Sequence, residues 1–105
     1  GIMVPLTTSH SYLDLAMVLN LPVLVVARPG LGTINHALLT IMALRSRGLR
    51  IAGIVINHLS KKRPGPAERT GPPVIERLSG VPIIGHVKYG QKDLRTIMRC
   101  LLTLK

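Results

Sequence analysis

Three kinds of segment follow one another without a break from Val23 to Arg47: an apolar run, a turn with two glycines, and a stretch with helical spacing. The five residues from Val23 to Ala27 are all apolar, which is typical of a strand covered on both faces of a parallel sheet. Neighbouring parallel strands need a crossover between them, and a helix usually supplies it. This succession therefore favours a fold in which strands alternate with helices.

The segment from Thr33 to Arg47 predicts that helix. Its apolar residues recur at spacings of three and four, namely Ile34, Ala37, Leu38, Ile41 and Leu44. We expect Thr33 to be the N-cap and Gly48 to follow the last turn. The first amides of a helix lack partners within it and lie at the positive end of its dipole, so an anion is stabilised there.

The turn from Arg28 to Gly32 has two interpretations. It is not a usual phosphate loop, because no Gly-Lys-Ser or Gly-Lys-Thr follows. It also lacks the third glycine of the dinucleotide fingerprint, since Asn35 stands at that place. An ordinary strand-to-helix turn and an anion site both fit these residues, and the glycines alone do not decide between them.

Two further apolar runs predict strands at 51–56 and 82–87. Helices are predicted from Ser11 to Asn20, from Val74 to Leu78 and from Leu94 to Leu102, whereas the proline-rich segment from His58 to Pro73 is expected to be a surface loop. The fold class is therefore α/β, with a mostly parallel sheet and flanking helices. The 105 residues are expected to form a single domain, whole or partial.

Ligands of open α/β sheets bind at the carboxyl ends of the strands. In this chain those ends carry the turn from Arg28 to Gly32, the pair Asn57 and His58, and the loop from Lys88 to Gly90. We expect these three loops to converge on one edge of the sheet.

Composition and charge restrict the classes of partner that the chain is expected to bind. The chain has 14 lysines and arginines against four acids, a net charge of +10 that favours anionic partners. No aromatic residues alternate with the basic ones to stack on bases, so no specific nucleic-acid partner is expected. The apolar stretch from Leu19 to Ala27 is interrupted by Asn20 and Pro22, so no membrane span is predicted. One cysteine cannot form an internal disulfide, which favours a cytoplasmic location.

Reactive residue types form no known catalytic or metal motif. The four histidines show no His-x-x-x-His or Cys-x-x-Cys spacing, and no serine has a Gly-x-Ser-x-Gly setting. Cys100 lies on an apolar helix face, where it is expected to be a small core residue. The residues by themselves therefore give no catalytic residue and no metal ligand.

Several segments together resemble the dethiobiotin synthetase family, a ligase family of biotin biosynthesis. The closest likeness runs from Leu21 to Thr40 and continues at Gly53 to Asn57. Shorter agreements follow in the family's order: Val4-Pro-Leu6, Pro66 to Thr70, Val74 to Leu78 and Val81 to Gly85. The likeness covers about residues 1 to 90 and fades in 91–105, a basic tail that is expected to be helical.

The resemblance implies a P-loop NTPase-like fold and a cytoplasmic homodimer. It implies an enzyme that uses ATP, Mg²⁺ and CO2 to close the ureido ring on 7,8-diaminononanoate. In the family the phosphate loop and the metal-binding carboxylates lie before the segment that matches Val4-Pro-Leu6. We therefore expect this chain to correspond to the C-terminal portion of such a domain, without its phosphate-loop half, and to be inactive alone.

The resemblance also implies a place for the substrate carboxylate. In the family it is received at the glycine turn and helix start, across the subunit interface, which maps to Gly32, Thr33, Ile34 and Asn35. Arg69 stands where some members have a tyrosine near this carboxylate, and its guanidinium suits a charged partner. A solvated loop arginine is the other interpretation of Arg69.

A second implied site binds the nucleotide. Asn57 stands where the family recognises adenine, and an amide both donates to and accepts from that base. His58 follows it, and the loop of Lys88, Tyr89 and Gly90 matches further adenine and ribose contacts. A proline is usual in the family at the place of Lys88. From its type alone Asn57 also suits a turn.

Two other functions are compatible with these residues. One is another ATP-dependent ligase on the same scaffold, such as the cobyrinate amidase group. The other is a non-catalytic module that binds nucleotide or polyanion through charge.

Overall fold

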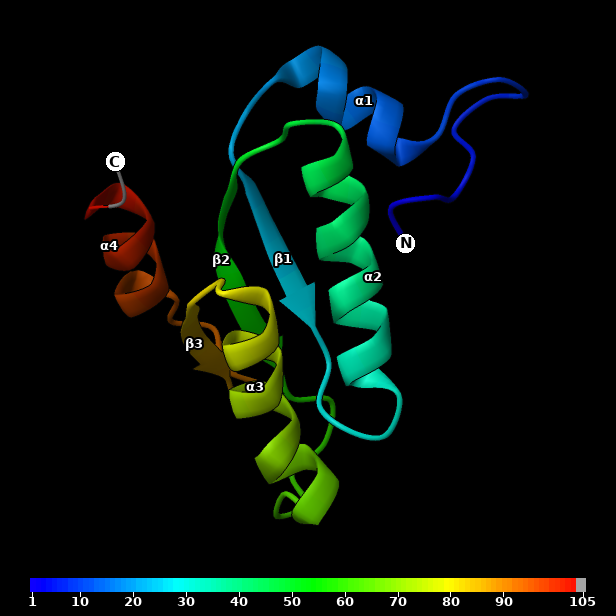
Figure 1. The fold of residues 1–105 in the computed structure, drawn as a ribbon. Coiled ribbons are helices and arrows are strands. Elements are labelled where there is room, and N and C mark those ends of the chain that lie inside the picture. Colours follow the sequence, from blue (N-terminus) through cyan, green and yellow to red (C-terminus); the bar gives the residue numbers. More distant parts are fainter. Residues whose placement is uncertain (104–105) are drawn as a thin grey trace.

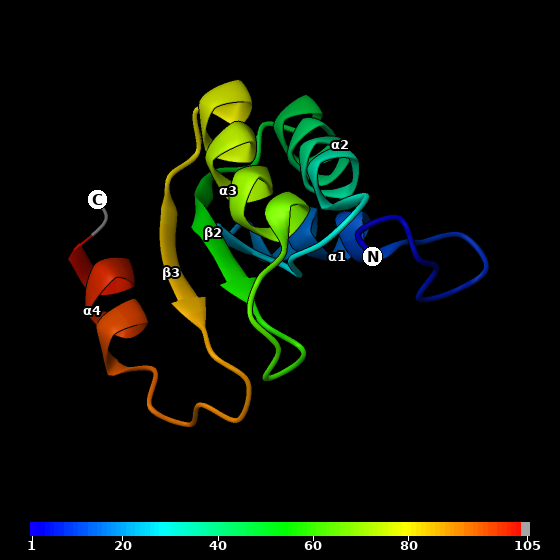
Figure 2. The ribbon, with the colours of Figure 1, turned by 90° about the horizontal axis from the view of Figure 1, so that it is seen from below.

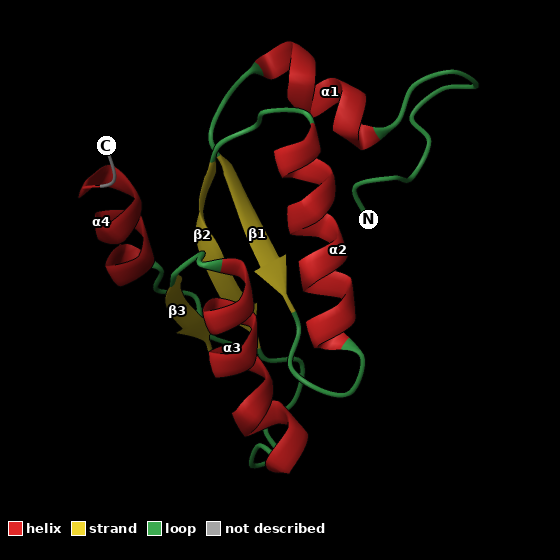
Figure 3. Cartoon of the chain, viewed as in Figure 1, coloured by secondary structure: helices red, strands yellow, loops and turns green. Residues whose placement is uncertain are grey.

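The structure, a computed structural model, describes residues 1–103 and consists of helices around a small sheet (Figure 1). In chain order the elements are α1 (Tyr12–Leu19), β1 (Val23–Ala27), α2 (Thr33–Ser46), β2 (Ile51–Asn57), α3 (Pro66–Ser79), β3 (Ile83–Val87) and α4 (Arg95–Thr103). Figure 3 shows how strands and helices alternate along the chain. The predicted α/β class is confirmed.

The sheet has three parallel strands in the order β1-β2-β3. Val25 of β1 lies opposite Ile54 of β2, and Ile56 of β2 lies opposite His86 of β3. The register shifts between Ile54 and Val55. The three strands predicted from the apolar runs are therefore confirmed, and all three carboxyl ends point the same way.

Helices α2 and α3 lie side by side over one face of the sheet, and α4 packs against β3 from the other side (Figure 2). The largest fully buried side chains are Ile41, Leu44, Ile54, Ile56 and Ile75, from α2, β2 and α3. The core is aliphatic, as a sequence without Trp or Phe requires. In this core, α2 and α3 pack on one face of β2, and β1 and β3 flank β2 in the sheet.

The start and end of α1 follow local sequence signals. The Ser11 amide donates to the Asp14 carboxylate at 2.7 Å, and the Asp14 amide donates to the Ser11 hydroxyl at 3.4 Å, which completes a capping box. These hydrogen bonds hold the pKa of Asp14 below its usual value. Asn20 ends the helix in the left-handed conformation.

The N-cap expected at Thr33 is wrong by one residue. Gly32 is the N-cap, with a φ of 85°, and Thr33 is the first helical residue. A backbone with this positive φ suits glycine and strains a β-branched residue. Thr33 is buried instead, and its hydroxyl donates to the Arg28 carbonyl oxygen at 2.5 Å.

The surface loop expected from His58 to Pro73 is also corrected, because α3 begins at Pro66 rather than near Val74. Proline suits the first helical position, where its missing amide is not needed. The Gly65 amide donates to the Glu68 carboxylate at 2.9 Å and fixes this start.

Tertiary packing favours the helix at the first of the two prolines inside α3, since Pro73 is exposed. A proline inside a helix costs about 3 kcal/mol, which is why Pro72 and Pro73 argue against a helix in the sequence. However, Pro72 is buried, and a Cβ placed on Gly71 would lie 3.4 Å from a Thr33 methyl group. Burial of this face against α2 offsets the lost backbone hydrogen bonds.

The expected helical tail is only partly helical, since residues 91–94 precede the helix. Helix α4 spans Arg95–Thr103, and residues 104 and 105 of the expected 91–105 tail lie outside the described residues. Asp93 accepts from the Arg95 amide at 3.0 Å and forms an ion pair with its guanidinium at 2.6 Å, which lowers the pKa of Asp93. None of the helices within residues 1–103 is long and apolar enough to cross a membrane.

Helix α4 approaches β3 most closely at a glycine. A Cβ built on Gly85 would lie 2.8 Å from Cγ1 of Ile97, which is buried in the interface. Ile97 is branched at Cβ and therefore has few rotamers in which to move aside. The missing side chain at Gly85 thus sets how closely α4 can pack.

Gly85→Ala is therefore expected to lower the free energy of unfolding by about 1–3 kcal/mol, the usual cost of overpacking a tight contact. Urea unfolding followed by circular dichroism measures this change. Adding Ile97→Val, which removes a methyl group from the clash, should restore part of the loss. Equal losses in the single and double variants would show that Ile97 does not set the α4 position.

Candidate functional site

The start of α2 leaves two backbone amides without hydrogen-bond partners in the described part of the chain. Gly30 and Gly32 have φ values of 117° and 85°, which turn the chain from β1 into the helix. The His36 amide donates to the Gly32 carbonyl oxygen at 3.1 Å. Among the described residues, the amides of Ile34 and Asn35 have no hydrogen-bond partner. Two free amides at a helix N-terminus favour a carboxylate or phosphate.

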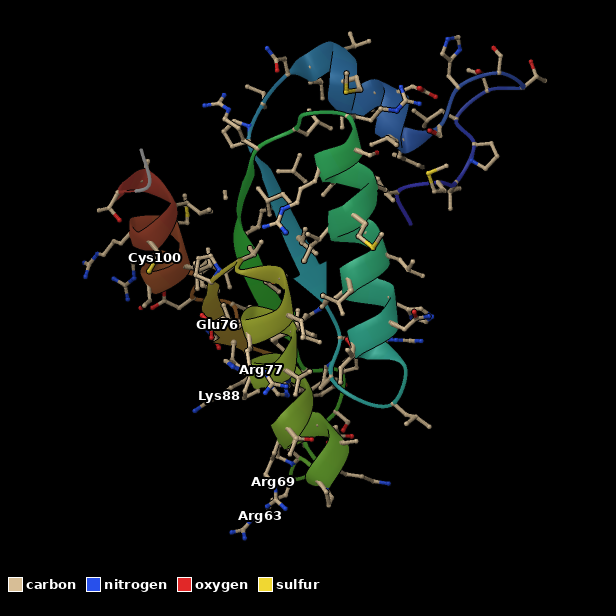
Figure 4. All side chains as sticks on the ribbon, viewed as in Figure 1. Arg63, Arg69, Glu76, Arg77, Lys88 and Cys100 are labelled. Atoms are coloured by element: carbon tan, nitrogen blue, oxygen red, sulfur yellow. The ribbon has the colours of Figure 1, made fainter. Side chains whose placement is uncertain are left out.

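A second site is a cavity of about 790 Å³ between α3, β3 and the loop after β2. One wall is apolar and is formed by Pro64, Pro72, Pro73 and Ile83. Basic side chains surround it: Lys61, Lys62, Arg69 and Lys88. Figure 4 labels Arg69 and Glu76 on α3, and Lys88 directly after β3. A cavity of this size accommodates a small organic ligand.

The basic groups around the cavity have no acidic partner. Within residues 1–103 the one ion pair joins Arg95 and Asp93. The two carboxylates of the cavity wall accept backbone hydrogen bonds instead, Glu68 from Gly65 at 2.9 Å and Glu76 from Ile83 at 3.2 Å. The cavity therefore carries a positive charge that attracts anions.

Two histidines meet in the wall of the cavity. His58 Nε2 lies 3.0 Å from His86 Nδ1, and the ring planes differ by 26°. The 5.3 Å between the ring centres is close to the largest separation that this contact allows, so the rings lie end to end rather than face to face. Partial burial and the neighbouring His58 lower the pKa of His86 below 6.5.

The loop after β3 is closed by a glutamine. The Gln91 amide donates to the Lys88 carbonyl oxygen at 2.9 Å, and the Lys88 amide donates to the Gln91 side chain at 3.0 Å. Gly90 lies between them with a φ of 76°. A defined turn thus forms although Lys88 stands where the family usually has proline.

The structure divides the expected site residues into two groups. His58, Lys88 and Tyr89 line the cavity, and so does Arg69, which was expected near the substrate carboxylate. Asn57 is the last residue of β2, half-buried beside them, and Gly90 is in the adjoining turn.

The other group, Gly32 to Asn35, lies at the start of α2. The two groups are connected through α3, which packs closely against the start of α2. A Cβ placed on Gly71 would lie 3.4 Å from Cγ2 of Thr33 and 3.9 Å from Cγ1 of Ile34. Arg69 precedes that contact by two residues, but its side chain lies in the cavity wall.

Sequence reasoning missed several polar residues of the cavity wall, among them Lys61, Lys62, Glu76 and His86. His86 was detectable in principle, because it lies one residue before the end of a strand that neighbours Asn57 and His58. The lysines were assigned to a solvated loop, since the early start of α3 was not foreseen. Glu76 needed the fold of α3 against β3.

The carboxylates do not form a metal site within residues 1–103. No three His, Cys, Asp or Glu side chains there lie close enough to hold one ion. Asp14 and Glu68 cap helices, Glu76 accepts from Ile83, and Asp93 pairs with Arg95. The residues at hand do not fit a Mg²⁺ site.

Comparisons with known proteins agree on one family. A family model described as an AAA domain matches residues 1–94. The chain is 51% identical over 85 residues to the ATP-dependent dethiobiotin synthetases BioD of Bacillus licheniformis and of Bacillus subtilis strain 168. It is 62% identical over 58 residues to the enzyme of the same name from Anaeromyxobacter dehalogenans strain 2CP-C.

The matches cover much of this chain and less of the relatives. The two Bacillus matches span 81% of this chain and 36% of each relative. The Anaeromyxobacter dehalogenans match spans 55% of this chain and 26% of that relative. The chain thus spans about a third of the length of the curated relatives it matches.

Thr33→Val is expected to lower the free energy of unfolding by about 1 kcal/mol, because it removes the hydroxyl that holds the turn through the Arg28 carbonyl oxygen. Thr40→Val is the matched control, since its hydroxyl bonds to the His36 carbonyl oxygen on a less buried part of α2. We expect its effect to stay within about 0.5 kcal/mol. Equal effects in urea unfolding would contradict a special role for Thr33.

The unfolding free energy should also fall as the pH is lowered through about 6.5. The pKa of His86 is lower in the folded chain than its ordinary value of 6.5, so the unfolded chain binds more protons in this range. Stability is therefore highest above about pH 6.5 and is lost as the pH falls toward the folded pKa. His86→Gln should flatten this slope in urea titrations between about pH 8 and pH 5.5, while His10→Gln should not.

Proposed function

The chain belongs to the AAA domain family and, within it, to the dethiobiotin synthetases, and we propose that it supplies substrate and nucleotide contacts of an ATP-dependent dethiobiotin synthetase. The reaction is the closure of the ureido ring on 7,8-diaminononanoate with CO2 and ATP. The observation that carries this proposal is the identity of 51% over 85 residues to a named dethiobiotin synthetase. The family model matches residues 1–94, which include both candidate sites.

The substrate carboxylate is assigned to the start of α2. The amides of Ile34 and Asn35 support this role, because they have no hydrogen-bond partner within residues 1–103 and are available to donate to an anion. Gly32 and Thr33 hold the turn in which these amides lie. The substrate's charge would replace the missing hydrogen-bond acceptors. In this proposal the site is shared with the partner subunit of a cytoplasmic homodimer, and Arg69 remains a candidate second contact.

The adenine base is assigned to the carboxyl ends of β2 and β3. Asn57 ends β2, and its amide matches the donor and acceptor pattern of adenine. His58, Lys88 and Tyr89 line the adjoining cavity, and Gly90 lets the loop turn back beside it. The chain's own residues would thus bind and orient the nucleotide.

Mg²⁺ belongs to the proposed reaction, where it would neutralise phosphate charge. The described carboxylates do not fit it, since each already holds a structural hydrogen bond or ion pair. We therefore derive no step through the metal from these residues.

Binding of polyanions through charge is the second candidate, and the unpaired cations around the cavity favour it. The two functions differ in their response to salt. Binding through charge alone weakens steeply as salt rises, whereas a base pocket keeps its preference between nucleotides. The cobyrinate amidase alternative has less support, because the relatives reported above are named dethiobiotin synthetases.

Asn57→Ala is expected to reduce the preference for ATP over GTP by about tenfold, since a bidentate base contact contributes about 1–3 kcal/mol of discrimination. Calorimetric titration of the 105-residue chain with each nucleotide measures the preference. Asn20→Gly is the matched control, because it removes an amide at the end of α1 and keeps a residue that tolerates the left-handed conformation. An unchanged preference in Asn57→Ala would exclude Asn57 from base recognition.

A further inference from the structure

A glutamine closes the turn between β3 and α4, which carries three of the residues assigned to the nucleotide. The Gln91 amide donates to the Lys88 carbonyl oxygen at 2.9 Å, and the Gln91 side-chain oxygen accepts from the Lys88 amide at 3.0 Å. Within residues 1–103 the Lys88 amide has no other acceptor. Two hydrogen bonds of opposite direction thus join the first and last residues of this turn.

The turn depends on local hydrogen bonds because little of it is buried. Gly90 is its third residue and has a φ of 76°, whereas Tyr89 before it has no positive φ, which is the pattern of a type II turn. Tyr89 is 54% exposed, and Lys88 is exposed as well. Segments with few buried contacts open at a low free-energy cost, so the closure by Gln91 decides how well the turn is ordered.

The same side chain connects the turn to α4. Gln91 Nε2 donates to the Asp93 carbonyl oxygen at 2.6 Å. The Asp93 carboxylate in turn accepts from the Arg95 amide at 3.0 Å, at the first residue of α4. Because α4 packs against β3 through Ile97, the turn is attached to the sheet on both sides.

We propose that Gln91 is a positioning residue for the nucleotide, because its hydrogen bonds hold the turn in the conformation that presents Lys88 and Tyr89 to the ligand. The inference rests on the nucleotide site proposed above. Both side chains line the cavity, as does His58 after β2. Without Gln91 the turn would become ordered only on binding, and the cost of ordering it would lower the affinity.

Gln91→Ala is expected to weaken the binding of ATP and of GTP by about fivefold each, the order of effect of one or two exposed hydrogen bonds. The factor is the same for both nucleotides because the cost of ordering the turn does not depend on the base. Calorimetric titration of the 105-residue chain measures both affinities. Leu94→Ala is the matched control, since it shortens another exposed side chain of the loop and should change either affinity by less than about twofold.

Lys88→Pro separates positioning from a general loss of stability. The Lys88 amide is not part of the hydrogen-bonding between β2 and β3, Lys88 has no positive φ, and Val87 before it is in a strand, so proline fits this place. The fixed φ of proline restricts the turn without the Gln91 side chain. In the Lys88→Pro background, Gln91→Ala should therefore weaken ATP binding by less than about twofold.

This double-mutant cycle cancels the effect of removing the lysine charge, because both backgrounds are compared with their own parent. A fivefold loss in the unmodified chain and a smaller one in Lys88→Pro supports the positioning role. Equal losses in the two backgrounds would overturn it.

The order of the turn can also be followed without nucleotide. In amide hydrogen exchange measured by NMR, the protection factor at position 91 should fall by about fivefold in Gln91→Ala and be restored by Lys88→Pro. The amides of β2 should keep their protection, which shows that the fold is intact. Unchanged protection at position 91 would overturn the inference.

Failure of the nucleotide proposal has a different signature. Asn57→Ala without effect on the preference for ATP over GTP would exclude base recognition, yet the exchange at position 91 would still respond to Gln91→Ala. Conversely, a normal preference for ATP with affinities that Gln91→Ala does not change would leave the nucleotide site in place and overturn the role of Gln91.

Discussion

The burial of β2 on both faces is the constraint on which the rest of the structure depends. Gly53 to Ile56 are buried, and the strand is hydrogen-bonded to β1 on one edge and to β3 on the other. Helices α2 and α3 take their positions by covering Ile54 and Ile56. Because the three strands are parallel, the loops that follow them all emerge at the edge where β2 ends.

Local signals in the sequence were sufficient for the strands and for α1. A fully apolar run has few alternatives to a buried strand, and the Ser11 and Asp14 cap needs only neighbouring residues. Helix α3 could not be predicted in full, since the cost of Pro72 is visible in the sequence but the compensating contact of Gly71 with Thr33 is not. The pairing of His58 with His86 was hidden for a similar reason, because it depends on a register that shifts after Ile54.

The hydrogen bonds and the ion pair that the four acidic residues form explain why the cavity is positively charged. Each of Asp14, Glu68, Glu76 and Asp93 serves a helix end, a strand start or a neighbouring arginine. Among the described residues, none of these carboxylates forms an ion pair with the lysines or the arginine that line the cavity. Four of the 14 lysines and arginines, namely Lys61, Lys62, Arg69 and Lys88, line the cavity, and they are separate from the acids that stabilise the fold.

The aliphatic core also has a spectroscopic consequence. The chain has no tryptophan or phenylalanine, so its ultraviolet emission comes from two tyrosines. Tyr12 begins α1 near the amino ends of the strands, and Tyr89 lines the cavity at their carboxyl ends. The unmodified chain thus contains one fluorophore at the cavity and one at the opposite end of the sheet as an internal reference, and occupancy of the cavity can be followed without an attached label.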